Sequence, residues 1–178
     1  MSAVTSLQGM VHTHERFDFV VNAPLDVAWP LFGADGERAW APDWHPVFIW
    51  PAPAADVGGM VFKVAHGERT AVWVNTVFDR IASRIQYVYF LADVMVTVIT
   101  LKLKPTGGAT QVEVTYERTA LADTARDAVS QMAERDKMSG PEWSQQIDRH
   151  LRCGIRPIAP LDDSANEVQF NPQAEEPI

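Results

Sequence analysis

Residues 94–120 read VMVTVITLKLKPTGGATQVEVTYERTA, and the period of this stretch decides the fold class. Leucines alternate with lysines over residues 101–104, and successive side chains of a β-strand point to opposite faces of its sheet. The same alternation places Met95, Thr97 and Ile99 on the face that carries the leucines. The stretch therefore begins with a strand that buries one face.

A second strand is expected at residues 111–120, where valines alternate with polar side chains, and the Gly107-Gly108 pair before it is typical of a tight hairpin turn. Other segments read as strands bounded by turn residues: 15–22, 47–50, 60–65, 70–79 and 83–91. Their spacing of about ten residues predicts an antiparallel meander. One apolar face of such a sheet must be covered by another element.

Short helices are expected between the first two strands. Pro24 suits the first turn of one helix, and a second short helix is expected over residues 37–41. A longer helical pattern covers residues 123–135, where apolar residues recur at helical spacing.

The last helix is expected over residues 140–153. Trp143, Ile147 and Leu151 recur four residues apart, which predicts that they face the sheet and that Trp143 is largely buried. Residues 139–142 read SGPE, which resembles a capping box with an early proline. This helix is the expected cover for the sheet.

An aromatic segment at residues 36–51 reads GERAWAPDWHPVFIWP and holds three of the six tryptophans, Trp40, Trp44 and Trp50. Its interleaved prolines prevent a regular helix or central strand from running through its middle. Large aromatic side chains on an irregular segment wall either a core edge or a ligand cavity. Both interpretations are open from these residues alone.

Length and composition indicate one domain over residues 1–159. The chain has 178 residues with 47% apolar and 21% charged side chains, which is ordinary for a globular protein. No run approaches the roughly 18 apolar residues of a membrane span, and the N-terminus lacks a signal-peptide pattern. The single cysteine, Cys153, excludes an internal disulfide and favours a cytoplasmic location.

The net charge of −8 is unevenly distributed. Residues 160–178 hold five acidic residues without Lys or Arg, together with three prolines, so we expect a poorly ordered tail, with docking through Val168 and Phe170 as the alternative. Because neither part clusters Lys or Arg, the sequence argues against a nucleic-acid partner.

These elements follow the order of a helix-grip fold, and the chain resembles the START/polyketide cyclase–dehydrase (SRPBCC) superfamily over residues 12–155. The resemblance rests on packing residues, in particular Ala23-Pro24, Gly36-Glu37-Arg38 with Trp40, Val72-Trp73-Val74, Thr115-Tyr116 and Glu142-Trp143. It implies an α+β fold in which a curved antiparallel sheet of about seven strands wraps a C-terminal helix and leaves an apolar cavity. Members of this superfamily bind lipids, polyketides or other hydrophobic molecules, and some are cyclases or aromatases.

Candidate ligand-binding residues follow from this cavity. Aromatic, methionine and strand-borne polar side chains are its expected walls: Trp40, Trp44, Phe62, Trp73, Asn75, Tyr87, Tyr89, Met95, Thr97, Tyr116, Met132 and Trp143. Protein groups, a ligand or cavity water could each satisfy the polar members. His66, Glu68 and Arg69 are expected at a hairpin turn by the cavity mouth, where they could orient a ligand or simply form an exposed turn.

Dedicated catalytic or metal motifs are not found in the sequence, so we expect no metal and no cofactor. His12 and His14 share a strand face but lack a third ligand nearby in sequence. Three functions remain open: a carrier or sensor of an apolar ligand, a cyclase, aromatase or dehydratase type of enzyme, and a chaperone-associated interaction module. A monomer and a homodimer are both compatible with the sequence.

Overall fold

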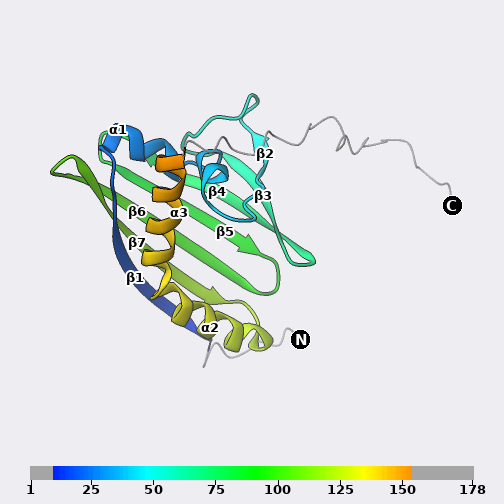
Figure 1. Ribbon diagram of the computed structural model, residues 1–178. Helices are drawn as coiled ribbons and strands as arrows, with labels where there is room; N and C mark the ends of the chain where they lie inside the picture. Colours follow the sequence, from blue (N-terminus) through cyan, green and yellow to red (C-terminus); the bar gives the residue numbers. More distant parts are fainter. Residues whose placement is uncertain (1–9, 154–178) are drawn as a thin grey trace, which may run out of the picture.

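The computed structural model describes residues 10–153, which form one seven-stranded antiparallel sheet in the order β1-β7-β6-β5-β4-β3-β2 (Figure 1). The strands are β1 (His12–Val21), β2 (Val47–Trp50), β3 (Val61–His66), β4 (Arg69–Asp79), β5 (Arg84–Leu91), β6 (Met95–Thr106) and β7 (Ala109–Ala120). The predicted fold class is confirmed. The expected acidic tail, residues 160–178, lies outside the described residues.

The β6–β7 hairpin has the predicted parity. Met95, Thr97 and Ile99 are buried on the inner face, together with the two leucines that follow them on β6. Gly107 and Gly108 have φ values of 56° and 88°, a left-handed conformation that glycine adopts without steric cost. The hairpin thus forms where the alternation and the glycine pair predict it.

The first and second strands of the chain lie at opposite edges of the sheet. β1 pairs with β7, so that His12 lies opposite Thr119, whereas β2 pairs only with β3. The inner face of β1 carries Phe17, Phe19 and Val21, which are all buried.

The helices are α1 (Leu25–Ala28), α2 (Arg126–Asp136) and α3 (Ser139–Cys153), with 3-10 turns η1 (Trp29–Phe32), η2 (Gly36–Ala39) and η3 (Asp123–Ala125). The segment predicted as a short helix at 37–41 is a 3-10 turn, and the helix predicted at 123–135 begins as one. The expected capping box is wrong, because the Ser139 hydroxyl donates to the carbonyl oxygen of Arg135, 3.3 Å away. None of the helices among residues 10–153 is long and apolar enough to cross a membrane.

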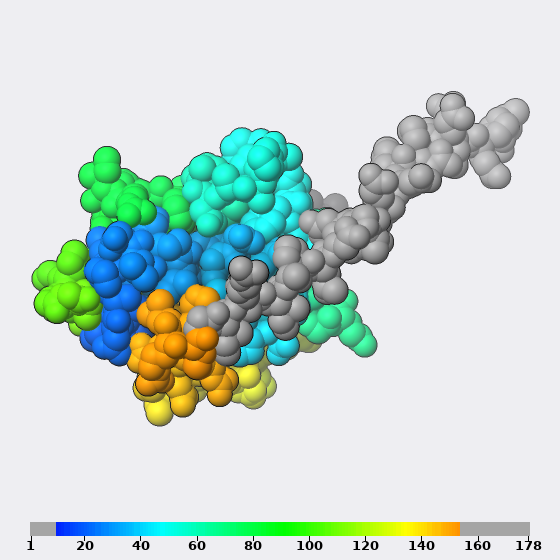
Figure 2. Space-filling view, turned by 45° about the horizontal axis from the view of Figure 1, so that its top comes forward, coloured from blue at the N-terminus to red at the C-terminus, as the bar shows by residue number. Residues whose placement is uncertain are grey.

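Helix α3 packs on the sheet, mainly against β1 (Figure 1). Gly140 makes the close approach possible, since a Cβ there would lie 3.0 Å from the carbonyl oxygen of Asp18. Ile147 is fully buried as predicted. Trp143 is only half-buried, which corrects the expectation of a largely buried side chain. In the space-filling view, α3 (orange) adjoins the first strand and the short helices (blue) (Figure 2).

A tight turn between η1 and η2 carries the aromatic segment toward the sheet. A Cβ at Gly36 would lie 1.8 Å from the carbonyl oxygen of Pro30, which no L-residue tolerates without backbone movement. The backbone amide of Ala34 donates to Asp56 at 2.9 Å, which ties the same turn to the loop after β2. The turn therefore depends on a side chain being absent at position 36.

We predict that Gly36→Ala lowers the free energy of unfolding by more than about 2 kcal/mol, because the new methyl group overlaps backbone. Gly58→Ala is the matched control, since its Cβ would meet only the carbonyl oxygen of Thr76 at 4.0 Å. Urea denaturation followed by far-UV circular dichroism measures both variants. Equal stability of the two variants would contradict the proposed contact.

Candidate cavity between the sheet and helix α3

Two adjoining hollows, of about 220 and 280 Å³, lie on the inner side of the sheet. The first hollow is lined by residues of β4, β5, β6 and β7, of the segment from η2 to Trp44, and of α3. They are Glu37, Trp40, Ala41, Pro42, Trp44, Trp73, Tyr87, Ile99, Leu101, Tyr116, Glu142, Trp143 and Gln146. The second hollow shares Trp44, Trp73, Ile99 and Tyr116 with it and adds Asp43, Val64, Ala65, His66, Ala71, Tyr89 and Arg118. The two hollows adjoin through these shared residues, and only the first is also lined by the C-terminal helix; both are called the cavity below.

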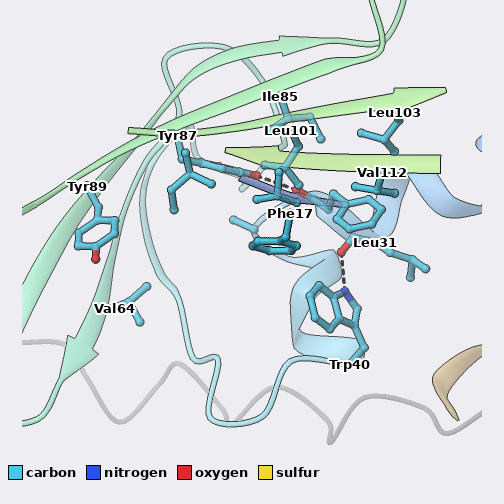
Figure 3. Packing of buried hydrophobic residues seen from close by; sticks show 14 of the residues in the cluster. Phe17, Leu31, Trp40, Val64, Ile85, Tyr87, Tyr89, Leu101, Leu103 and Val112 are labelled. Atoms are coloured by element: carbon cyan, nitrogen blue, oxygen red, sulfur yellow. Dashed lines mark hydrogen bonds between the residues drawn. The ribbon is translucent and has the colours of Figure 1, made fainter. Parts of the chain in front are cut away.

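Hydrogen bonds to the backbone of η1 and of the turn just after it fix three rings of the cavity wall. The indole nitrogen of Trp40 donates to the carbonyl of Leu31 at 2.7 Å, as Figure 3 shows. The indole nitrogen of Trp44 donates to the carbonyl of Ala34 at 2.7 Å. The hydroxyl of Tyr87, on β5, donates to the carbonyl of Phe32 at 3.0 Å.

The rings of the wall also contact one another at fixed angles. Trp44 meets Trp73 edge-on with centroids 5.2 Å apart, and Trp73 stacks on Tyr89 at 4.4 Å. On the opposite side, Trp40 and Trp143 lie 5.3 Å apart. Such edge-on and stacked contacts stabilise aromatic side chains beyond the area that they bury. The wall is therefore a connected aromatic surface.

Glu37 is the acidic residue of the 3-10 turn η2, and it lines the first hollow. Burial and, secondarily, the negative charge of Asp56 raise the pKa of Glu37 well above its ordinary value. Within the described residues, no side chain or backbone group donates a hydrogen bond to its carboxyl. Burial also raises the pKa of Tyr87, and the charges of Glu37 and Asp56 add to that shift. The cavity thus contains a carboxyl group without a partner.

The second hollow ends at a buried ion pair. Arg118 on β7 binds Asp136 at the end of α2 through two contacts, one of which measures 3.1 Å. The guanidinium lies 4.2 Å from the ring centroid of Tyr116. Burial raises the pKa of Asp136 and the charge of Arg118 opposes that rise. The pair is neutral overall, so it leaves no free positive charge at this end.

Several proteins of known structure share this architecture. No protein-family model matches the sequence, and no curated protein matches it. Solved structures do match: norcoclaurine synthase from Thalictrum flavum has a TM-score of 0.58 at 12% identity, covering 83% of this chain and 89% of that one. The chain has the helix-grip fold. CalU16 from Micromonospora echinospora shares this helix-grip fold with a TM-score of 0.56 at 14% identity, over 84% of this chain and 88% of that one.

A third structure, Ara h 8.0201, matches with a TM-score of 0.57 at 13% identity, over 80% of this chain and 99% of that chain. At these identities the likeness concerns the fold. The resemblance to the START/SRPBCC helix-grip proteins that the sequence predicts is confirmed at that level.

Most of the aromatic candidates line the helix-grip cavity. The residues in question are Trp40, Trp44, Trp73, Tyr87, Tyr89, Tyr116 and Trp143. His66 lines the second hollow, whereas Glu68 and Arg69 do not, and Arg69 instead donates to the carbonyl of Ala92 at 2.8 Å. The hairpin therefore contributes one side chain to the cavity.

Other candidates belong to the core behind the wall: Phe62, Asn75, Met95, Thr97 and Met132 line neither hollow. Phe62 stacks behind Trp73 at 5.6 Å, and Met95 accepts from the Tyr89 hydroxyl through its sulfur, 3.8 Å away. Asn75 donates to the carbonyls of Val77 (2.7 Å) and Gln86 (3.0 Å) when its amide is turned to satisfy both. Protein groups therefore satisfy Asn75.

Sequence reasoning missed the charged members of the cavity. Glu37 and Glu142 belong to the residues that carry the family resemblance, and those were interpreted as packing residues. Arg118 lies on β7, where only the alternation of the valines was interpreted. The feature of the sequence that pointed to Glu37 was its position at the start of the aromatic segment, residues 36–51. Among residues 10–153, no group of three His, Cys, Asp or Glu side chains is arranged to hold a metal ion.

We predict that Glu37→Gln stabilises the folded protein near neutral pH. Because the folded state raises the pKa of Glu37, folding favours the proton-bound form, and stability falls as the pH rises above the ordinary value of 4.5. The variant should unfold at higher urea than wild type at about pH 7.5 and at the same urea well below pH 4.5. Glu68→Gln, which removes the same charge at an exposed hairpin, is the matched control.

Proposed function

We propose that this protein binds an apolar small molecule in the helix-grip cavity and acts as its carrier or sensor. The observation that carries the proposal is the ring wall of the first hollow. The donors of Trp40, Trp44 and Tyr87 are already bonded to backbone carbonyls, so these rings offer mainly carbon surface to an occupant. Burial of apolar surface favours binding by roughly 25 cal/mol per Å².

An enzyme of cyclase or dehydratase type is the second candidate, and Glu37 is the observation that favours it. A carboxyl group whose pKa is raised by burial can donate or accept a proton near neutral pH. Tyr87 and Tyr116 line the same hollow and could orient a carbonyl group of a substrate. One matching structure is named as a synthase, which is compatible with chemistry on this fold.

The proposed compartment is the cytoplasm. Cys153 is an exposed free cysteine, which suits a reducing environment.

A neutral fluorescent probe, N-phenyl-1-naphthylamine, tests the binding site. We predict micromolar binding to the folded protein and at least about tenfold weaker binding to Trp44→Ala and Tyr89→Ala, because each loses ring surface of the wall. Trp50→Ala is the matched control, since Trp50 is 52% exposed and lies on the edge strand β2. Thermal melts of all variants separate loss of binding from loss of stability.

The opposite pattern, with binding lost in Trp50→Ala and retained in Trp44→Ala, would place the probe on the outer surface and refute the cavity site. Solvent extraction of the purified protein followed by mass spectrometry supplies an independent check. A stoichiometric apolar compound supports the carrier, and a compound that the protein converts on incubation supports the enzyme.

A further inference from the structure

The first hollow carries a one-sided charge pattern. Of the thirteen lining residues that fall within 10–153, two are acidic, Glu37 and Glu142, and none is Lys, Arg or His. Six of the others are aromatic: Trp40, Trp44, Trp73, Tyr87, Tyr116 and Trp143. A wall of aromatic rings with acidic and no basic groups is a specific chemical environment rather than a generally apolar one.

Aromatic rings attract cations through the negative potential of their faces, and the attraction is strongest for indole and for a desolvated cation. The rings of this hollow are inclined to one another. Trp44 and Trp73 lie at 88°, Trp73 and Tyr87 at 72°, and Trp40 and Trp143 at 58°. Rings in several orientations therefore line one hollow, and an aromatic lining of this kind favours a cationic guest.

In the described part of the chain, the basic side chains near Glu37 have other partners. Arg38, the next residue, pairs with Asp35 at 3.5 Å, donates to the carbonyl of Pro46 and lies over the ring of Phe48. Arg118, at the far end of the second hollow, is paired with Asp136. The other neighbours that interact with Glu37 are Asp56, Tyr87 and Tyr116, which are acidic or neutral.

We propose that the occupant of the first hollow is an organic cation, an apolar amine or quaternary ammonium group that contacts the aromatic side chains of the lining and is balanced by the carboxylates of Glu37 and Glu142. This inference rests on the proposed binding function and names the chemical class of its ligand. A cation gives the Glu37 carboxylate a partner that residues 10–153 do not provide. With a purely neutral ligand Glu37 would hold its proton, because its pKa is raised, and would contribute no charge attraction to binding.

The probe is the trimethyl(2-phenylethyl)ammonium ion, compared with its neutral carbon isostere, (3,3-dimethylbutyl)benzene. The two molecules have the same shape and differ in one charge, and the quaternary nitrogen does not titrate. Tryptophan fluorescence or calorimetry gives both dissociation constants. We expect the cation to bind at least about tenfold more tightly than the isostere.

Charge-neutral variants of the carboxylates test their roles. Glu37→Gln should weaken the cation at least about tenfold and change the isostere less than about twofold. Glu142→Gln should act in the same direction and less strongly, because Glu142 is exposed. Glu68→Gln removes the same charge outside both hollows and should leave both ligands unaffected.

The pH dependence gives a second readout. A bound cation favours the ionised form of Glu37, so affinity for the quaternary ion should rise with pH and then level off. Other ionisable side chains that line the two hollows include Glu142, Asp43 and His66. Glu37→Gln should abolish the part of this rise in affinity that is due to Glu37. The affinity of the isostere should show no such rise.

Two results would overturn the inference while leaving the proposed function standing. One is equal or tighter binding of the isostere together with unchanged cation affinity in Glu37→Gln. The other is preferred binding of 4-phenyl-2-butanone, a neutral acceptor of similar size, with that preference lost in Glu37→Gln, which would make Glu37 a proton donor to a carbonyl. If these ligands and the neutral naphthylamine all fail to bind the folded protein, both proposals fall.

Discussion

The cavity depends on backbone carbonyls of η1 and of the turn just after it that have no backbone partner among the described residues. A helix end buried in a protein must find donors for such groups, because an unsatisfied buried carbonyl is costly. Here Trp40, Trp44 and Tyr87 supply them, from the aromatic segment and from β5. One set of hydrogen bonds therefore completes the turn, attaches it to the sheet and orients the rings that enclose the hollow.

The same turn places Glu37 where folding alone would not favour a carboxyl group. The tight contact of Gly36 with Pro30 holds η2 against η1, and the side chain that follows enters the aromatic hollow. A carboxyl group whose pKa is raised by burial and which has no hydrogen-bond partner in the described chain is the kind of feature that functional sites retain. The cost is explained if the site exists to receive something else.

The strands could be predicted because their side chains alternate, and alternation needs no knowledge of distant residues. The β6–β7 hairpin shows this best, since leucine–lysine parity and the Gly107-Gly108 turn agree. The division of the inner face between core and cavity could not be predicted. Phe62 and Trp73 look alike in sequence, yet one is covered by its neighbour and the other lines the hollow, because Trp44 and the η2 segment approach only part of the sheet. The role of Arg118 could not be predicted for the same reason, because its partner Asp136 lies on a different element, α2.

The edge position of β1 has a consequence for how the chain is made. The strand begins at His12, but its partner in the sheet is β7, with Thr119 opposite His12. A ribosome must therefore release nearly the whole domain before the first strand can pair, and contacts this distant in sequence make folding slow. Until then the phenylalanines of β1 and the indoles of the aromatic segment remain exposed to other nascent chains. Such a protein has reason to rely on chaperones during synthesis, whatever its cavity holds afterwards.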